Sequence, residues 1–291
     1  MKPYLGDPTY TIAVLKSHGI SARKKYGQNF LIDRAVLQDT VEAADIQEED
    51  CVLEIGPGIG TLTQYLAERA RRVVAVEIDR SLQDVLEDTL SGFPNVRVIW
   101  GDILKADIGE IAKEENAGRP LKVAANLPYY ITTPILLNLL ENGAWISGIT
   151  VMIQKEVADR ILAVPGTKDY GALTLAVQYY AKPELVRVVH PSSFLPQPGV
   201  DSAVMHLERY GEPPVQCADK TLMFSLIRAS FNQRRKKLVN GIVNNAGLPY
   251  TKEQVENALV SCSIRPDVRG ETLTLSQFAA LSDALSAVAI A

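Results

Sequence analysis

The chain is poor in the residues that build disulfide frameworks and metal centres. It contains three cysteines and three histidines in 291 residues. Cys51, Cys217 and Cys262 lie far apart and form no Cys-x-x-Cys pair, so we expect neither a disulfide framework nor a zinc site. The histidines fall in none of the motifs described below. We therefore expect no metal.

Long hydrophobic runs are also missing. No apolar run approaches the roughly 18 residues that a membrane-spanning helix needs. The first twenty residues lack the basic segment and apolar core of a secretory signal. The composition, 47% hydrophobic and 22% charged, is ordinary for a globular protein. We expect a cytoplasmic protein with reduced thiols that does not associate with membranes and acts as a monomer.

The chain has no overall excess of basic residues, because its formal net charge is −4. This argues mildly against a nucleic-acid binder, but local clustering matters more than the total. Two basic clusters occur: Arg23, Lys24 and Lys25, and Arg234, Arg235, Lys236 and Lys237. Such runs are usually solvated faces. The alternative is that they bind RNA phosphates.

Short apolar runs alternate with segments of helical periodicity in the first two thirds of the chain. The expected strands are 51–55, 72–79, 95–100, 122–126 and 149–153. The expected helices between and before them are 37–44, 61–69 and 81–90, the last with Ser81 as its N-cap. This alternation predicts an α/β fold, with a mostly parallel sheet and helices on both faces.

The pattern changes after Glu208. Residues 211–214 (GEPP) resemble a linker, and from Asp219 onward only helical periodicity occurs. We therefore predict an α/β domain over residues 1–208 and a small all-helical domain over residues 209–291.

Polar residues gather at the ends of the expected strands, where parallel sheets bind ligands. A glycine-rich turn, residues 56–60 (GPGIG), follows the first strand and is preceded by Glu54. An acidic residue there fits a cationic ligand better than a pyrophosphate. Glu77 ends the next strand, where a carboxylate binds ribose hydroxyls, and Asp102 can accept a hydrogen bond from an adenine amine. Together they favour S-adenosylmethionine over a dinucleotide.

Each of these carboxylates also has a structural interpretation. Glu77 and Asp79 could be solvent-facing groups at a strand end. Asp102 could cap the next turn. Glu54 could orient the glycine loop by accepting its backbone N–H groups, without touching a ligand.

Residues 126–129 (NLPY) follow the expected strand 122–126. The Asn126 side chain and a backbone carbonyl can each accept one N–H of a planar exocyclic amine. Pro128 fixes the backbone, and the ring of Tyr129 can lie flat against a nucleobase. This suits methylation of an amine, although a strand end followed by a turn is the plainer interpretation.

Seven motifs in order make the chain resemble a known family, the KsgA group of small-subunit ribosomal RNA adenine N6,N6-dimethyltransferases, which is related to the Erm methyltransferases. The motifs are 25–31 (KYGQNFL), 52–58 (VLEIGPG), 75–79 (AVEID), 101–104 (GDIL), 126–131 (NLPYYI), 194–202 (FLPQPGVDS) and 231–238 (FNQRRKKL). The resemblance runs from about residue 24 to about residue 285. It implies a Rossmann-like class I methyltransferase domain with a seven-stranded sheet.

The resemblance also implies roles for individual residues. The cofactor-binding residues would be Gln28, Asn29, Leu31, Gly56, Glu77, Asp102 and Asn126. The catalytic segment would be Asn126, Leu127, Pro128 and Tyr129, with Phe194 packing against the flipped adenine opposite Tyr129. Leu127 separates this group from the DNA and protein N-methyltransferases, which usually carry proline there.

The implied activity is transfer of methyl groups from S-adenosylmethionine to N6 of two adjacent adenines near the 3′ end of 16S rRNA in the small ribosomal subunit. Two alternatives remain at this point. One is an Erm-like enzyme that acts on 23S rRNA. The other is a factor that binds nucleic acid or aids ribosome assembly without depending on catalysis.

Overall fold

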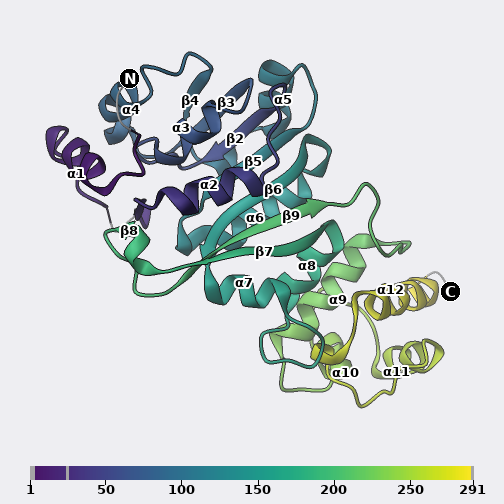
Figure 1. Ribbon diagram of the computed structural model, residues 1–291. Helices are drawn as coiled ribbons and strands as arrows, with labels where there is room; N and C mark the ends of the chain where they lie inside the picture. Colours follow the sequence, from purple (N-terminus) through teal and green to yellow (C-terminus); the bar gives the residue numbers. More distant parts are fainter. Residues whose placement is uncertain (1–3, 24–25, 290–291) are drawn as a thin grey trace. The chain divides into compact units, whose positions relative to one another are not determined.

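The computed structural model describes residues 4–23 and 26–289 (Figure 1). The chain forms two compact units. The α/β unit comprises Met1–Ala158 and Pro183–Arg209, and the helical unit comprises Asp159–Lys182 and Tyr210–Ala291. The sequence predicts one boundary between the domains, after residue 208. In the structure the chain leaves the α/β unit after Arg209, and it also leaves it earlier for residues 159–182, which belong to the helical unit.

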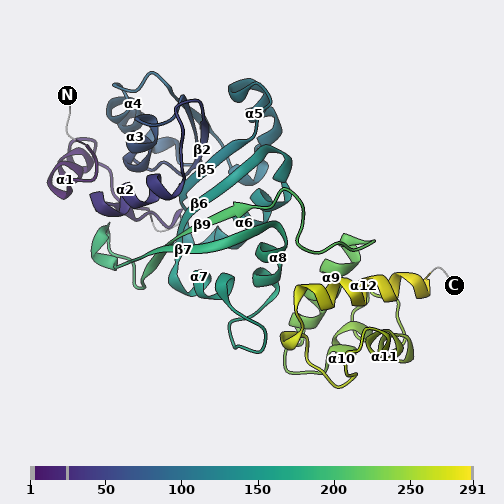
Figure 2. The same ribbon diagram turned by 45° about the vertical axis from the view of Figure 1, so that its right-hand side comes forward.

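A seven-stranded sheet is the centre of the α/β unit. The strand order is β4-β3-β2-β5-β6-β9-β7. In that order the strands are Val96–Trp100, Arg72–Glu77, Cys51–Ile55, Leu121–Asn126, Ile146–Gln154, Ser202–Arg209 and Ala181–Val189. The first five are mutually parallel, and β9 pairs antiparallel with β6. Figure 2 shows β6, β9 and β7 running side by side. The expected mostly parallel α/β fold is confirmed.

The central strands are buried on both faces. All five residues of β2 are buried, and five of the six residues of β3 are buried. Such strands are continuous apolar runs rather than alternating patterns, because helices cover both sides of a parallel sheet. Their polar residues can then lie only at the strand ends.

The helices of the α/β unit lie between and before the strands. They are α1 (Pro8–Ser17), α2 (Arg34–Ala43), α3 (Thr61–Ala67), α4 (Gln83–Thr89), α5 (Ile108–Asn116), α6 (Thr132–Glu141) and the start of α7 (Lys155–Leu162). A separate two-stranded sheet pairs β1 (Phe30–Leu31) with β8 (Phe194–Leu195), in antiparallel register. This pairing joins two sequence motifs that are 163 residues apart in the chain.

The predicted helix at 81–90 begins differently from the expectation. A 3-10 turn, η2 (Arg80–Leu82), precedes α4, and its N-cap is Asp79. The Asp79 carboxylate accepts the backbone N–H of Ser81 at 3.2 Å and the Ser81 hydroxyl at 2.7 Å. Ser81 as the N-cap is therefore wrong, because its hydroxyl donates to the buried Asp79 carboxylate, and the residue that precedes α4 is Leu82, which makes no side-chain cap.

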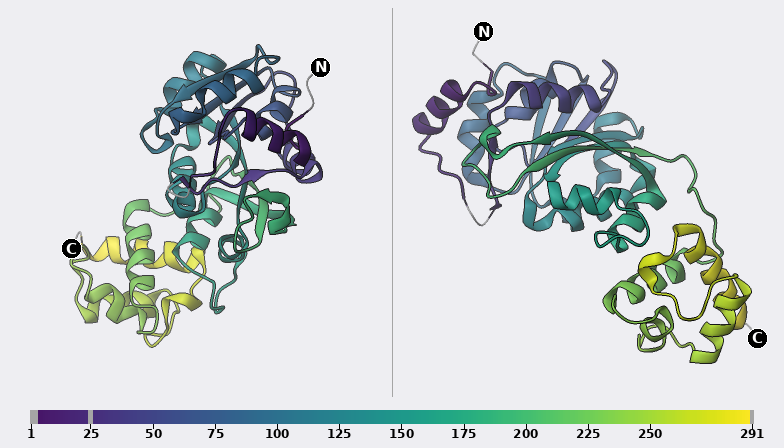
Figure 3. Two further views of the ribbon diagram at one scale, coloured as in Figure 1. Left: turned by 90° about the vertical axis from the view of Figure 1, so that its left-hand side faces the viewer. Right: turned by 60° about the horizontal axis from the view of Figure 1, so that its bottom comes forward.

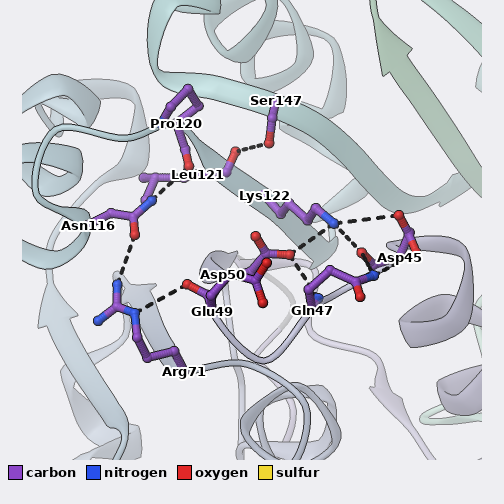
Figure 4. A network of polar contacts seen from close by, with 10 residues as sticks. All are labelled: Asp45, Gln47, Glu49, Asp50, Arg71, Asn116, Pro120, Leu121, Lys122 and Ser147. Carbon is purple, nitrogen blue, oxygen red and sulfur yellow. Dashed lines mark hydrogen bonds and ion pairs between the residues drawn. The ribbon is translucent and has the colours of Figure 1, made fainter.

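A polar network lies at the amino-terminal ends of the strands β2, β3 and β5 (Figure 4). Arg71 donates to the carbonyl of Glu49 and to the side-chain oxygen of Asn116. The Asn116 amide donates in turn to the carbonyls of Arg119 and Pro120, which lead into β5. The network therefore ties α5 to the chain entering three parallel strands.

The helical unit has its own core. Its helices are α8 (Ala172–Tyr180), α9 (Lys220–Asn232), α10 (Leu238–Val243), α11 (Lys252–Ser261) and α12 (Leu275–Ala289). Figure 3 shows α9 to α12 gathered together. Phe278, Met223 and Leu175 are fully buried in the core of this unit. The Tyr170 hydroxyl donates to the carbonyl of Leu273 at 2.7 Å, which explains why residues 159–182 belong here.

Among the residues that the structure describes, no helix is both long and apolar enough to span a bilayer. Within the same residues, no group of three or more His, Cys, Asp and Glu side chains is arranged to hold a metal ion.

We expect the Asn116→Ala variant to lower the free energy of unfolding by about 1–3 kcal/mol, because it removes a buried amide that donates to two partly buried carbonyls and accepts from the Arg71 guanidinium. Denaturant titration of the variant measures the change. The matched control is Gln83→Ala, which removes an exposed amide on α4 and should change stability by less than about 0.5 kcal/mol. Equal effects of the two variants would show that the network does not stabilise the sheet edge.

Candidate functional site

A pocket lies at the carboxyl ends of β2, β3, β4 and β5. It is lined by every residue that the motifs predict for cofactor binding and catalysis, with the exception of Phe194. The sheet explains this convergence, since Ile55, Glu77, Trp100 and Asn126 are the last residues of four neighbouring parallel strands. The prediction that these strand ends meet is confirmed.

The glycine loop after β2 presents its backbone to the pocket. Gly56 has φ of +67°, and a Cβ there would meet no atom within 4 Å. Gly60 has φ of +89° and packs against Leu90, whose Cδ2 would lie 3.0 Å from a Cβ. The two glycines therefore have different roles. Gly56 leaves open space at the pocket wall, whereas Gly60 allows the start of α3 to pack closely against Leu90.

Glu77 orients this loop. One oxygen of its carboxylate accepts the backbone N–H of Gly58 at 3.2 Å, and the other accepts that of Asp79 at 2.7 Å. Burial raises the pKa of Glu77, and the two backbone hydrogen bonds oppose that rise. Glu77 is 4% exposed and Asp79 is 2% exposed. The alternative that these two carboxylates face solvent is therefore wrong.

Glu54 lies beneath the loop and is 1% exposed. Burial raises the pKa of its carboxyl to about 8, and repulsion from Glu77 adds to the rise. The Thr63 hydroxyl opposes the rise but makes no hydrogen bond of ordinary geometry. Glu54 Oε2 has no hydrogen-bond partner among the described residues, and the same holds for the Thr61 hydroxyl. An unpaired, buried carboxyl oxygen at a pocket wall fits a cationic ligand group.

Asp102 serves two purposes. It caps the 3-10 turn η3 (Ile103–Lys105) by accepting the backbone N–H of Leu104 at 3.0 Å, and it also lines the pocket. No role was predicted for Ile78 and Ile103, which belong to the motifs 75–79 and 101–104 and also line the pocket. Ile78 is 48% exposed directly after a buried strand, and an apolar residue in that position is the signal that could have found it.

The orientation of the Asn126 amide is fixed by the N-terminal segment. Asn126 Nδ2 donates to the carbonyl of Asn29 at 3.1 Å. The Asn29 side chain in turn donates to the carbonyl of Gly27 at 3.1 Å, which closes a tight turn. With its nitrogen used in this way, the Asn126 amide keeps Oδ1 as an acceptor, and no described residue donates to that oxygen.

Tyr129 is held by the motif 194–202 through a residue other than the one that the resemblance implies. Its hydroxyl shares a 2.5 Å hydrogen bond with the Ser202 hydroxyl at the start of β9, and burial raises its pKa. Phe194 is 1% exposed and packs in the core with Leu31. The structure therefore brings the motif 194–202 to the site through Ser202, and it does not place Phe194 at the pocket wall.

Residues 26–31 of the N-terminal segment line the pocket and are held in place through Gln28 and through β1. Gln28 Nε2 donates to the Asp79 carboxylate at 3.0 Å, and Arg23 Nη1 lies 3.3 Å from the same carboxylate. Leu31 is buried where β1 pairs with β8. Arg23 thus contacts the fold, while Lys24 and Lys25 lie outside the described residues.

The second basic cluster does not lie on a helix, contrary to the helical spacing assumed from the sequence. Helix α9 ends at Asn232 and α10 begins at Leu238, so the cluster forms the turn between them. Arg234 is used within the helical unit, where it pairs with Glu271 at 2.7 Å and donates to the carbonyls of Thr167 and Lys168. Its neighbours in the turn are exposed: Arg235, Lys236 and Lys237.

The sequence matches the family described as ribosomal RNA adenine dimethylase over residues 19–285. It is 56% identical over 281 residues to the ribosomal RNA small subunit methyltransferase A of Lachnoclostridium phytofermentans, covering 96% of this chain and 97% of the relative. It is 50% identical to the protein of the same name from a Geobacillus species, covering 99% of this chain and 100% of the relative.

Two solved structures are similar over most of the chain. The dimethyladenosine transferase from Plasmodium falciparum has a TM-score of 0.70 at 27% identity, covering 86% of this chain and 95% of its own. The 23S rRNA methyltransferase ErmE has a TM-score of 0.67 at 31% identity, covering 89% of this chain and 100% of its own.

Replacement of the buried Glu54 should change how stability depends on pH. Below its ordinary pKa of 4.5, the carboxyl is protonated in the folded and the unfolded chain alike. Between 4.5 and about 8 the unfolded chain releases this proton while the folded protein keeps it, so the free energy of unfolding falls as pH rises. Above about 8 the loss is constant.

We therefore expect ligand-free Glu54→Gln to be more stable than the parent protein by a few kcal/mol at pH 9, with the difference shrinking toward pH 5. Urea denaturation across this range measures the effect. The control is Glu87→Gln on the exposed face of α4. A stability difference that is the same at every pH would refute the raised pKa.

Proposed function

This chain belongs to the ribosomal RNA adenine dimethylase family, and from that membership we propose that it transfers methyl groups from S-adenosylmethionine to N6 of two adjacent adenines near the 3′ end of 16S rRNA in the small ribosomal subunit. The observation that carries the proposal is the Asn126 amide, whose Oδ1 is offered as an acceptor at the wall of the pocket.

The residues around the pocket fit S-adenosylmethionine. The bare backbone of Gly56 leaves room for its methionine part, and the unpaired Glu54 oxygen suits the positive charges that this part carries. Glu77 would hold the ribose hydroxyls, as strand-end carboxylates do in related folds. Asp102 would accept the adenine amine, with Ile78 and Ile103 flanking the ring. The cofactor supplies a methyl group activated by its sulfonium.

The acceptor half of the site is formed by residues 126–129. The target nitrogen of adenine is a weak nucleophile, because its lone pair is delocalised into the ring. Asn126 Oδ1 and the Leu127 carbonyl would each accept one of its N–H groups, which localises the lone pair and aims it. Positioning and charge placement of this kind supply the catalysis, and no strong base is required.

The target base must leave its stack to reach this pocket. Tyr129 supplies an aromatic face whose tilt is fixed by the hydrogen bond to Ser202. Tyr130, 57% exposed at the same wall, is a second face that the motifs did not single out. We assign the stacking to these two tyrosines rather than to Phe194, which is enclosed in the core.

The similarities favour the small subunit over the Erm-like alternative. The curated relatives at 50% and 56% identity are both named for the small subunit, whereas the 23S rRNA enzyme is 31% identical. The complete pocket argues against a factor that only binds RNA or aids assembly. We propose that the protein acts as a monomer.

We propose that the helical unit contributes RNA binding through Arg235, Lys236 and Lys237, which are exposed on one turn. The helical unit contains more basic than acidic residues, although the whole chain is acidic. The Arg234 guanidinium stabilises this turn by pairing with Glu271 and by donating to two backbone carbonyls.

We expect Asn126→Ala to lower kcat for methyl transfer by about 100-fold or more, because the target amine loses its oriented acceptor. The measurement is transfer of labelled methyl groups to small subunits isolated without the modification, followed by mass mapping of the adenines. The matched control is Asn257→Ala, which removes an exposed asparagine from α11. Unchanged transfer by Asn126→Ala would rule out this mechanism, and modification of 23S rRNA instead would favour the Erm-like alternative.

We expect Lys236→Ala to weaken binding of the small subunit and to reduce the slope of log affinity against log salt by about 0.7–0.9, as loss of one phosphate contact does. Its thermal stability should match that of the parent protein. The control Lys252→Ala removes another exposed charge, from α11, and should leave the slope unchanged. Arg234→Ala should instead lower the thermal stability of the helical unit. Equal salt slopes for the two lysine variants would contradict a localised RNA contact.

A further inference from the structure

Asp79 is a buried carboxylate that joins three parts of the α/β unit. It is 2% exposed at the end of β3. One oxygen accepts the backbone N–H and the hydroxyl of Ser81 and lies 3.3 Å from Arg23 Nη1. The other accepts Gln28 Nε2 at 3.0 Å. Burial raises the pKa of Asp79, but the hydrogen bonds from Ser81 and Gln28 and the charge of Arg23 outweigh it, so the net shift is downward. Asp79 is therefore a paired anion at neutral pH.

Gln28 uses both ends of its amide in this arrangement. While Nε2 donates to Asp79, its Oε1 accepts the backbone N–H of Arg23 at 2.8 Å. This fastens the N-terminal segment to Asp79 just after β3, and the pairing of β1 with β8 fastens it two residues later, from Phe30 onward. Asn29 lies between these two attachments, Gly27 lies directly before the first, and both line the pocket.

The stretch held in this way carries the carbonyl that orients the Asn126 amide. That carbonyl belongs to Asn29, the residue directly after Gln28. On its other side, the backbone N–H of Asp79 donates to Glu77, and Glu77 accepts the N–H of Gly58 in the glycine loop. Hydrogen bonds thus connect the glycine loop to Glu77 and Asp79 and connect Asp79 to Gln28, and the peptide bond from Gln28 to Asn29 carries the connection on to the acceptor amide.

We propose that Asp79 is a positioning residue for methyl transfer, which by holding Gln28 fixes the Asn29 carbonyl and so presents Asn126 Oδ1 to the target amine. The proposal rests on the function proposed above. It also links the two halves of the site, because Glu77 on the cofactor side and Asn126 on the acceptor side are held through the same carboxylate. Hydrogen bonds to an ionised group are stronger than neutral ones, which suits a residue that must fix a segment with little regular structure of its own.

Asp79 also caps the turn η2, and a merely structural role has to be separated from positioning. Ser81→Ala provides the matched control, since it removes one hydrogen bond from the same carboxylate oxygen and leaves Gln28 in place. Asp79→Asn removes the charge and sets an amide N–H against the Gln28 amide, so that donor meets donor. Gln28 can then turn over only by giving up the backbone N–H of Arg23.

A reciprocal exchange restores the pattern. In the double variant Asp79→Asn, Gln28→Glu, the carboxylate at position 28 can accept both the amide of residue 79 and the backbone N–H of Arg23. The number of hydrogen bonds and the net charge of the pair are then those of the parent protein. A residue that acts only through the cap of η2 would gain nothing from this exchange.

The experiment compares the parent protein, Ser81→Ala, Asp79→Asn and the double variant. Hydrogen exchange of the backbone amides of residues 26–31 reports how firmly this segment is held, calorimetry reports S-adenosylmethionine binding, and steady-state transfer to an excess of unmodified small subunits reports kcat. We expect Asp79→Asn to speed the exchange of these amides and to lower kcat about tenfold or more. This is the size of effect expected from the loss of one charge-assisted hydrogen bond. The double variant should recover both to within about threefold, and Ser81→Ala should leave both unchanged.

Unchanged exchange in Asp79→Asn, an equal loss of kcat in Ser81→Ala, or no recovery in the double variant would each overturn the proposal. Failure of the proposed function is recognised separately, because the parent protein would then transfer no methyl groups to the small subunit while the exchange measurements remain interpretable.

Discussion

Burial of the central parallel strands on both faces is the constraint on which the rest of the structure depends. Strands β2 and β3 hold almost no exposed residue, so the polar groups of this region lie where the strands end. Parallel register then brings four such ends to one edge. The backbone groups that the strands leave unpaired at that edge are satisfied by side chains, and Glu77 takes up two of them. The site therefore forms where the buried parallel strands end and their polar groups meet.

The same edge explains why the cofactor and acceptor halves of the pocket are not independent. The carboxylates of β3 hold the glycine loop on one side and the N-terminal segment on the other. That segment in turn fixes the Asn126 amide at the end of β5. A short stretch of chain near the N-terminus, with little regular structure of its own, thereby becomes part of a site built on a rigid sheet.

Several side chains have roles that their position in a motif does not reveal. Asp102 both caps a turn and lines the pocket, so its two interpretations are compatible rather than exclusive. Arg234 stands first in a run of four basic residues, yet its guanidinium is used by Glu271 and two carbonyls within the helical unit. Phe194 belongs to a motif that reaches the site through Ser202 instead. For Arg234 and for Ser202 the partner lies far away in sequence.

The sequence by itself determined the α/β class, the five parallel strands, the glycine loop and the polar groups Glu77, Asp102 and Asn126, because buried parallel strands and their polar ends leave local signals in composition and spacing. It did not predict strands β7 and β9 or most of the aliphatic residues that line the pocket. It did not determine that Asp79 rather than Ser81 caps η2, that residues 159–182 join the helical unit, or that the basic cluster is a turn. Only the tertiary structure decided the orientation of the Asn126 amide and the pairing of Gln28 with Asp79. Those depend on contacts between residues about 50 to 100 positions apart, whose geometry no local pattern encodes.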